Sequence, residues 1–355
     1  MAITLCTFNA NNLFVRYRFG QTFPGDMSGK SAVNEPSLGY LPMYDPDMFD
    51  LFNPLQRDLT AKALSRNETG FPEVLCLQEI ESLIALRAFN ERHLGNHYTR
   101  ALLIDSRDFR QIDVGVLTRL EILRARTHVD DLDPKPDDPK RPFLFSRDCL
   151  EVELALPGGR RLTVFINHLK SKFVDPKQAN TLAKKKAARK KDDKYRGRQA
   201  DRVIALIQER FPGNAFTTEL FAVVGDLNDE PASKPLKKLY LNAGLEDALA
   251  RIPNEQDRWT HWFRSENSVS HIDALLLSPA LAQQTAGVAP VIERRGISFS
   301  RILQDGGIGP RLTHFQRVDD DPNPIDVDFR FPRFAQVDPE LYASDHCPIF
   351  LEIPE

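Results

Sequence analysis

The chain has 355 residues, of which 41% are hydrophobic and 27% are charged, a composition typical of globular proteins rather than disordered or fibrous ones. The formal net charge of -3 excludes a chain that is basic throughout, so any nucleic-acid-binding surface must be local. No stretch of sequence approaches the roughly 18 apolar residues that a membrane-spanning helix needs.

The four cysteines lie far apart and form no Cys-x-x-Cys pair, which disfavours a zinc site. Cys6, Cys76 and Cys347 sit in apolar runs, where cysteine acts as a small buried hydrophobe. Reduced thiols are typical of a reducing compartment. The first residues, MAITLCTFNANNLF, lack the basic start and long apolar run of a signal peptide. We therefore expect a cytoplasmic protein without membrane contact or an obligate protein partner.

Short apolar runs bounded by polar turns predict buried strands. In chain order they are Ile3–Phe8, Val74–Leu77, Val114–Leu117, Cys149–Leu156, Leu162–Asn167, Leu220–Val224, Ile272–Leu277 and Ile349–Ile353. Apolar residues at helical spacing predict helices at Asn53–Ser65, Ser82–His93, Arg198–Arg210 and Lys234–Ala243. Strands interleaved with helices are typical of an α/β protein. Some connections are too short for crossover helices, which favours mixed sheets.

We expect a single domain over residues 1–355 with four loop insertions. Segment 20–46 is rich in Gly, Pro and Ser, 130–142 in Pro and charge, and 313–342 in Pro and Asp. The fourth, 170–198, is strongly basic. Long loops within a compact domain are commonly functional or disordered.

Polar side chains stand at the ends of most predicted strands, where a rigid sheet positions the loops that carry chemistry. Phosphodiester hydrolysis calls for a hard divalent cation against the phosphate oxygens, and carboxylate and amide oxygens are its preferred ligands. Asn9, Glu79 and Asp345 supply such oxygens. Asp226 suits the carboxylate that positions the attacking water. Asn228, two residues on, can face the same side and fix the phosphate or the water.

Two histidines complete this set. His168 and His346 can each donate to the negative charge that develops on the phosphate. Asp273 is a natural partner to fix the tautomer of His346. Any one of these motifs alone is more often a strand end or a turn. Their joint occurrence, each at the edge of an apolar strand, favours a catalytic site.

The blocks FNANNL, LQEIE, DVGVLTR, INHLKSK, GDLNDEP, HIDALLLSP and SDHCPIFLEI resemble the endonuclease/exonuclease/phosphatase family and span nearly the whole chain. That family includes deoxyribonucleases, abasic-site endonucleases, sphingomyelinases and inositol phosphatases. The resemblance implies an α/β fold, a four-layer α/β/β/α sandwich of two mixed sheets flanked by helices. It also implies dependence on Mg²⁺, or on Mn²⁺ or Ca²⁺ in its place.

Carried over by position, the resemblance implies metal-binding residues Asn9, Glu79 and Asp345 and catalytic residues His168, Asp226, Asn228, Asp273 and His346. Asn11 falls where many members have Asp, and we place it among the substrate-binding residues. Abasic-site endonucleases have Tyr in place of His168, which disfavours that subgroup. His271 replaces the usual Arg before the strand. Asp113 stands where some members pair an acid with the first histidine, although a structural strand-end Asp is the alternative.

The segment from residue 170 to 198 carries twelve basic residues against three acidic ones and directly follows His168. A local cluster of positive charge can neutralise the phosphates of nucleic acid. We therefore expect Lys170, Lys172 and Arg198 to bind substrate. The alternative is a solvated helix with no partner.

Trp259 and Trp262 alternate along a predicted strand just before Asp273. They can stack on bases or on a flat substrate, but core packing is the commoner arrangement of such a pair. We interpret His261, between them, as structural.

Three functions are compatible with these motifs. The first is a nuclease that acts on DNA or RNA, with nucleic acid as the expected substrate. The second is a phosphatase or phosphodiesterase for a small molecule or a lipid headgroup, which would use the same centre. The third is a catalytically inactive binding module, which the complete set of candidate residues disfavours.

Overall fold

The computed structural model describes residues 2–17, 49–51, 53–65, 70–136, 139–140, 142–174, 179–264, 268–297, 304–305, 309–310, 314–315 and 332–354. The predicted insertion at 20–46 lies outside the described residues, as do 313 and 316–331 of the insertion predicted at 313–342.

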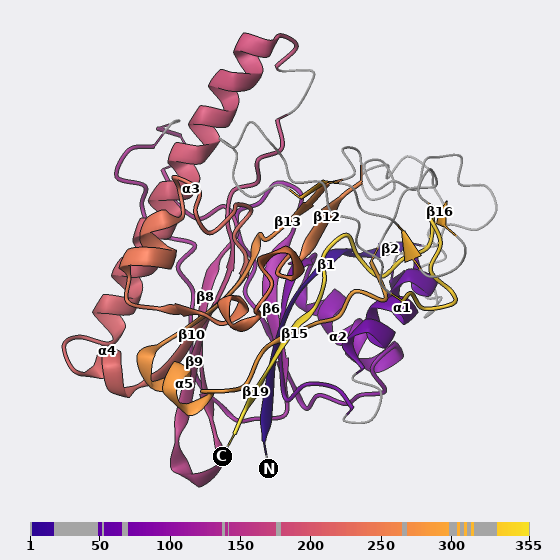
Figure 1. Cartoon of the computed structure of the whole chain (residues 1–355), viewed down its shortest axis with the longest axis horizontal. Coiled ribbons are helices and arrows are strands. Elements are labelled where there is room, and N and C mark those ends of the chain that lie inside the picture. The colour runs from indigo at the N-terminus through magenta and orange to yellow at the C-terminus, as the bar shows by residue number, and fades with distance from the viewer. Residues whose placement is uncertain are drawn as a thin grey trace.

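Two six-stranded sheets form the centre of the fold (Figure 1). The first has the order β15 (Val291–Ile292), β19 (Ile349–Ile353), β1 (Ile3–Leu13), β4 (Val74–Ile80), β6 (Asp113–Thr118) and β5 (Arg100–Leu103). The second has the order β11 (Glu246–Asp247), β14 (Asp273–Leu277), β10 (Leu220–Asp226), β9 (Arg161–His168), β8 (Cys149–Ala155) and β7 (Ile122–Arg126). One neighbouring pair in each sheet is parallel, β1 with β4 and β9 with β10, and the others are antiparallel. Both sheets are therefore mixed, as predicted.

Helices cover the outer face of each sheet, which gives the predicted four layers (Figure 1). They are α1 (Pro54–Leu64) and α2 (Leu83–Arg92) on the first sheet, and α3 (Leu182–Arg210), with the shorter α4 (Ala215–Thr218), on the second. A further short helix, α5 (Pro279–Gln284), packs its buried residues Leu281 and Ala282 into the core between the sheets. Leu86 and Phe89 of α2 pack with Phe8 of β1, and Val203 of α3 packs with Phe165 of β9.

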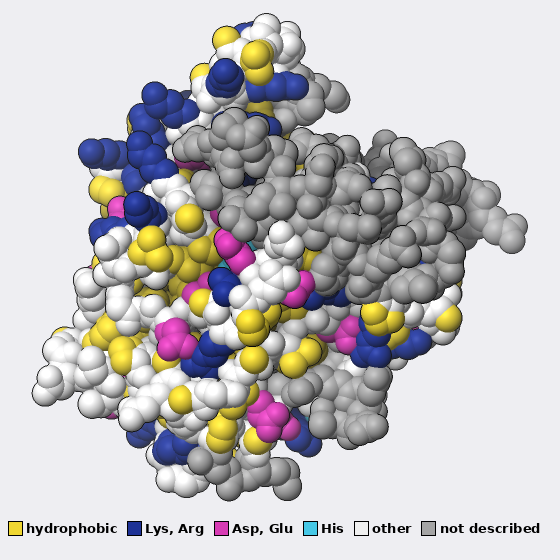
Figure 2. Space-filling model, in the orientation of Figure 1, with side chains coloured by type: hydrophobic (Ala, Val, Ile, Leu, Met, Phe, Trp, Pro, Cys, Tyr) yellow, Lys and Arg dark blue, Asp and Glu magenta, His cyan; other side chains and the backbone are white. Residues whose placement is uncertain are grey.

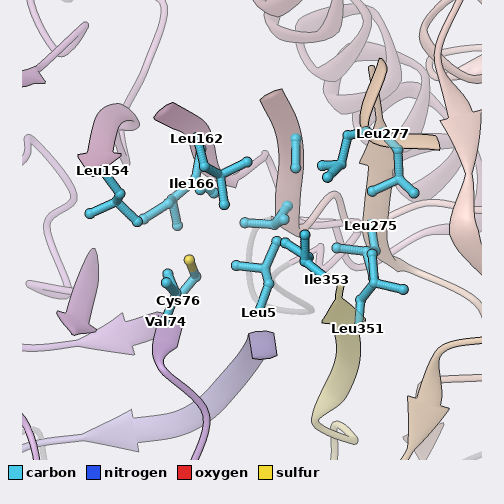
Figure 3. Close-up of a cluster of buried hydrophobic side chains, with 14 of the residues drawn as sticks. Leu5, Val74, Cys76, Leu154, Leu162, Ile166, Leu275, Leu277, Leu351 and Ile353 are labelled. Carbon is cyan, nitrogen blue, oxygen red and sulfur yellow. The ribbon is translucent and has the colours of Figure 1, made fainter. Parts of the chain in front are cut away.

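The inner faces of the two sheets bury a shared apolar core. Figure 3 shows part of it, with Leu5, Val74, Cys76, Leu154, Leu162, Ile166, Leu275, Leu277, Leu351 and Ile353 labelled. Side chains alternate between the two faces of a strand. Thus Leu162, Val164 and Ile166 of β9 point between the sheets, whereas Phe165 faces α3. This alternation between two apolar environments explains why the strands read as nearly continuous hydrophobic runs.

Within the described residues, short strands add three small sheets to the central pair. They are β2 (Val15–Tyr17) with β3 (Phe49–Leu51), β12 (His261–Phe263) with β13 (Ser268–Ser270) and β18 (His314–Phe315), and β16 (Gln304–Asp305) with β17 (Gly309–Pro310). In the described part of the chain, none of the helices combines the length and apolar character needed to cross a bilayer.

Two predicted segments differ from the structure. The expected helix at 234–243 contains only a short π-helical turn, Lys238–Asn242. Most of the predicted loop at 170–198 is helical: α3 begins at Leu182 and runs for 29 residues. Thr181 caps this helix by accepting a hydrogen bond from the backbone N–H of Lys184. The apolar spacing that predicts a helix starts only at Arg198, so the polar first half carries no such signal.

Gly225 allows β10 to lie close to β9 at the centre of the second sheet. Its φ is 121°, and a Cβ built there would lie 2.0 Å from the backbone oxygen of Asn167. We expect Gly225→Ala to lower the free energy of unfolding by about 3 kcal/mol or more, because strained backbone and overpacking each cost roughly 1–3 kcal/mol. Urea denaturation measures this change.

Gly213→Ala is the matched control. Gly213 also has a positive φ, 59°, but a Cβ there would meet no atom within 4 Å. The free energy of unfolding of that variant should fall by only about 1–2 kcal/mol, because the sole cost is the left-handed backbone conformation of an alanine. Equal losses in the two variants would contradict the steric explanation.

Candidate active site

The register of the second sheet brings three of the predicted catalytic residues side by side. Asp226 ends β10, and it is paired across the sheet with His168 of β9 on one side and with Asp273 of β14 on the other. All three side chains are almost fully buried. Residues that are 58 and 47 positions from Asp226 in sequence thus become its immediate neighbours.

The first sheet contributes Asn9 and Glu79 to the same place. Asn9 of β1 is paired with Gln78 of the parallel strand β4, so Glu79 follows directly. The side-chain amide of Asn9 donates to Asp226 Oδ2 at 3.1 Å, a hydrogen bond that joins the two sheets. Glu79 Oε1 lies 4.0 Å from His168 Nε2, and Glu79 Oε2 accepts from the backbone N–H of Asn12.

His346 and Asp273 form the predicted acid–histidine pair. His346 Nδ1 lies 2.9 and 3.1 Å from the two Asp273 oxygens, and its Nε2 lies 3.8 Å from Asp226 Oδ2. Burial lowers the pKa of His346, but the carboxylates of Asp273 and Asp226 more than offset this, so its pKa lies above the ordinary value. A cationic imidazole can donate from both nitrogens, which leaves Nε2–H to face an anionic substrate.

His168 has the opposite electrostatic character. Its Nε2 lies 2.6 Å from Arg147 Nη1, and because a guanidinium can only donate, this nitrogen must accept and the ring proton must be on Nδ1. Burial and then the Arg147 charge hold the pKa of His168 well below its ordinary value. The two predicted catalytic histidines therefore differ in charge, since His168 is neutral and His346 cationic, a separation typical of groups with different catalytic roles.

Asp226 is the hub of these contacts. Its Oδ2 faces the Asn9 amide and lies 3.4 Å from His168 Nε2, while its Oδ1 accepts from the backbone N–H of Asn228 at 2.8 Å. Burial raises the pKa of Asp226, the nearby Asp273 carboxylate adds to this, and cationic His346 opposes it. The Asn228 side chain donates to the backbone oxygen of Leu169, which ties the loop after β10 to the loop after β9.

The donors around Asp226 suit a hard divalent cation. Asp226, Asp273 and His346 offer one possible ligand atom each, all within 4.8 Å of one another. A cationic His346, however, has no lone pair for a metal. Glu79 and Asn9 offer the better donor atoms, since carboxylate and amide oxygens are the ligands that Mg²⁺ or Ca²⁺ prefers, although the Asn9 amide turns its nitrogen toward Asp226 and its oxygen accepts from the Asn11 backbone.

Asp345, the third predicted metal ligand, is less closely tied to this cluster. Its carboxylate is 40% exposed and lies 4.0 Å from His261 Nε2. Ser344 next to it donates to the backbone oxygen of Asn9, which brings this loop to the end of β1. Among the described contacts, Asp345 reaches neither Glu79 nor Asn9 directly.

The predicted substrate-binding residues divide into two groups. The guanidinium of Arg198, which was predicted to bind substrate, instead binds both carboxylate oxygens of Asp133 at 2.8–3.1 Å. Lys172 Nζ lies 2.6 Å from Asp229, and Lys170 Nζ lies 3.3 Å from Asp192, although both lysines keep about 30% of their side chains exposed.

Asn11 lies beside Asn9, whose side-chain oxygen accepts its backbone N–H at 3.0 Å. The Asn11 side-chain oxygen accepts from the amide of Asn12, and its φ of 49° is left-handed. Asn11 is thus held at the site, but one of its polar atoms is already engaged. Asp113 does not pair with His168 among the described contacts, because its carboxylate accepts from the backbone and hydroxyl of Ser106.

The aromatic pair does not form a stacking surface. Trp259 and Trp262 are fully buried in a cluster with Leu59 and Phe334, which confirms core packing. His261, between them, lies against His346 with ring centroids 4.6 Å apart and the two rings tilted by 51°. His271 is buried too, and its backbone N–H donates to Glu230 rather than to anything at the surface of the site.

Three buried residues that support the site escaped sequence reasoning. Arg147 sets the tautomer of His168, Thr260 Oγ1 donates to Asp273 Oδ2 at 2.6 Å, and Ser344 anchors Asn9. Ser344 is the first residue of the motif SDHCPIFLEI, so its place at the site could have been predicted from the sequence. Arg147 lies in a segment without a distinctive pattern, and the contact of Thr260, which stands between the two tryptophans, with Asp273 forms only in the folded chain.

Comparison with solved structures identifies proteins of the same fold. The human Nocturnin catalytic domain with bound sulfate is 12% identical with a TM-score of 0.54, over 99% of this chain and 94% of that one. SmcL is 10% identical with a TM-score of 0.53, over 99% of both chains. TDP2 of D. rerio, complexed with a single-strand DNA product, is 14% identical with a TM-score of 0.51, over 100% of this chain and 99% of that one.

Comparison with curated protein sequences found no match. Comparison with protein families matches residues 6–346 to the Endonuclease/Exonuclease/phosphatase family. That match includes every predicted catalytic and metal-binding residue, and the two flanked mixed sheets agree with it. The chain therefore belongs to the endonuclease/exonuclease/phosphatase family.

Proposed function

We propose that this chain is a metal-dependent phosphodiesterase, and specifically a nuclease that acts on DNA or RNA. The observation that carries the proposal is the convergence on Asp226 of neutral His168, cationic His346 and, from the first sheet, the side-chain amide of Asn9. These groups match the needs of phosphodiester hydrolysis, namely a base, a donor to the phosphate and ligands for a cation.

In this proposal, Asp226 accepts a proton from the attacking water, and its raised pKa suits a base that works near neutral pH. Asn228 holds the loop that orients the phosphate. His346, kept cationic by Asp273, donates from Nε2 to the charge that develops on the phosphate oxygens. His168, held neutral by burial and by the Arg147 charge, lies beside Asp226 with its Nε2 accepting from Arg147.

Asn9, Glu79 and Asp345 are the proposed ligands of the divalent cation. When bound, Mg²⁺, or Mn²⁺ or Ca²⁺, supplies positive charge against the phosphate oxygens. Asn11, Lys170 and Lys172 are proposed to contact substrate from the rim of the site. A structure of the same fold with a single-strand DNA product, that of D. rerio TDP2, supports nucleic acid as the substrate class.

A panel of substrates tests the proposed class of reaction. DNA, RNA, sphingomyelin, inositol phosphates and a chromogenic phosphodiester are each incubated with the protein in Mg²⁺ and in EDTA. We expect Mg²⁺-dependent cleavage of nucleic acid and slower cleavage of the chromogenic diester. Hydrolysis confined to sphingomyelin or to inositol phosphates would instead establish the lipid or small-molecule function.

Replacing Glu79 tests the proposed metal ligands. We expect Glu79→Gln to raise the Mg²⁺ concentration required for half-maximal activity by at least about tenfold, because one anionic ligand oxygen is lost. A Mg²⁺ titration of the initial rate measures this shift. Glu352→Gln, an exposed residue of β19 with the same change of charge, is the control and should keep the wild-type requirement. An unchanged requirement in Glu79→Gln would remove Glu79 from the ligand set.

We also propose that the protein works in a reducing compartment such as the cytoplasm. All four cysteines, Cys6, Cys76, Cys149 and Cys347, are buried as thiols. Burial raises the pKa of Cys76 and of Cys347, which suppresses the reactive thiolate. Buried, reduced thiols of this kind are compatible with a reducing compartment.

A further inference from the structure

The first half of α3 extends beyond the rest of the fold as an arm, which we define as residues Thr181–Lys194. From Thr181 to Lys191 every side chain is exposed except that of Ala188, which is partly exposed, whereas Val203 and Ile207 in the second half are buried against the sheet. Figure 1 shows the arm rising past the ends of the sheets, on the side away from the two termini. Since each helical residue adds 1.5 Å, the helical part of the arm is about 20 Å long.

Basic side chains surround the arm, whose two carboxylates, Asp192 and Asp193, pair with Lys170 and Arg196 at its base. It carries seven basic residues, Lys184, Lys185, Lys186, Arg189, Lys190, Lys191 and Lys194. At about 100° per residue, these side chains leave no gap wider than about 100° around the helix. Figure 2 shows Lys and Arg side chains gathered along this part of the molecule. Such a distribution differs from that of an interfacial membrane helix, which has one basic and one apolar face.

This charge acts against the helix when the arm is alone. Lys186 and Lys190, and Lys190 and Lys194, are like charges four residues apart, a spacing that destabilises a helix. The arm also buries almost no apolar surface that would compensate. A polyanion that surrounds the arm would relieve the repulsion, so the sequence suits a bound partner with negative charge on more than one side.

The base of the arm is fixed to the loops of the candidate active site. Arg196 of α3 is fully buried and binds Asp229, which follows Asp226 by three residues, with Nη2 at 2.6 Å from Oδ2. Its Nη1 donates to the backbone oxygen of Lys170, which follows His168 by two residues. A buried ion pair of this kind is costly to break. The direction of the arm is therefore set relative to His168 and Asp226.

We propose that the arm docks in the major groove of duplex DNA and thereby holds a phosphodiester bond at the Asp226 site. The B-DNA major groove, about 12 Å wide, admits an α-helix and flanks it with a phosphate backbone on each side. The A-form RNA major groove is too deep and narrow for this. The inference rests on the proposed nuclease function and assigns its substrate as double-stranded DNA.

Paired charge-reversal variants test the arm. We compare Lys186→Glu/Lys190→Glu with Arg87→Glu/Arg124→Glu, exposed positions on α2 and β7 that produce the same change of net charge. Binding of a fluorescent duplex DNA oligonucleotide is measured by anisotropy in EDTA, over a series of salt concentrations. We expect the arm variant to bind at least about tenfold more weakly and its salt slope to fall by about 2, since each lost phosphate contact lowers the slope by about 0.9.

The control variant should keep the wild-type affinity and slope. Equal losses in both variants, or none in either, would overturn the proposal. Preferential arm-dependent binding of duplex RNA, or of vesicles that contain phosphatidylserine, would overturn it as well. Hydrolysis of a small chromogenic phosphodiester in Mg²⁺ should be unaffected in the arm variant. If that reaction is absent even from the wild-type protein, the proposed function fails. The binding measurement still tests whether the arm binds duplex DNA.

Discussion

Replacing Asp226 with Asn is expected to lower the kcat for phosphodiester hydrolysis by about a thousandfold, the range in which removal of a general base falls. The change keeps the shape of the side chain, and the Oδ1 contact with the Asn228 backbone can survive. It removes the proton acceptor and the negative charge that faces both imidazoles. Steady-state kinetics with a chromogenic phosphodiester measure the loss, which should fall on kcat more than on KM.

Asp201→Asn is the control for this variant. Asp201 lies on α3, where its carboxylate pairs with Lys238 at an exposed position. An exposed pair contributes little to stability, so both the kcat and the melting temperature of the control should match the wild type. A kcat for Asp226→Asn within a few fold of the wild-type value would show that Asp226 is not the base.

Replacing His346 with Ala is expected to lower kcat by about a hundredfold to a thousandfold, as does the loss of one donor to a developing oxyanion. The variant leaves Asp273 buried without its imidazole, although Thr260 still donates to it. His93→Ala is the matched control, because His93 also pairs with a carboxylate, that of Asp58, but on the helical layer away from the site. The control should keep the wild-type kcat.

Asp273 and His346 should act as one unit. If Asp273 serves mainly to hold His346 cationic and oriented, the double variant Asp273→Asn/His346→Ala will be little slower than His346→Ala alone. Independent, multiplicative losses in the two single variants would show that Asp273 has a separate role. The comparison therefore distinguishes a positioning carboxylate from one that takes part directly.

The buried strands could be predicted from the sequence because both faces of each strand meet apolar layers. Val74–Leu77 and Leu220–Val224 were placed correctly, and the structure extends them to Ile80 and Asp226. The extensions include Glu79 and Asp226 themselves, since a strand can end on a polar residue that faces the site. The pairing of His168 with Asp226 depends on long-range register, which no local pattern encodes.

The parts that could not be predicted are those without apolar periodicity. The arm is helical although its sequence, TLAKKKAARKKDDK, presents no apolar stripe. Arg198 looked like a substrate contact because its charge stands in a basic run, but Asp133, from a distant loop, neutralises it. The role of Arg147 could not be predicted, because its contact with His168 forms only when β8 pairs with β9.

The most direct measurement is the initial rate of chromogenic phosphodiester hydrolysis by the wild-type protein in Mg²⁺, after EDTA, and after Mg²⁺ is restored. If the acids and imidazoles around Asp226 form a cation-dependent catalytic centre, the rate is present, lost and recovered in that order. A rate that EDTA leaves unchanged, or no hydrolysis in Mg²⁺, Mn²⁺ or Ca²⁺, would contradict a metal-dependent phosphodiesterase.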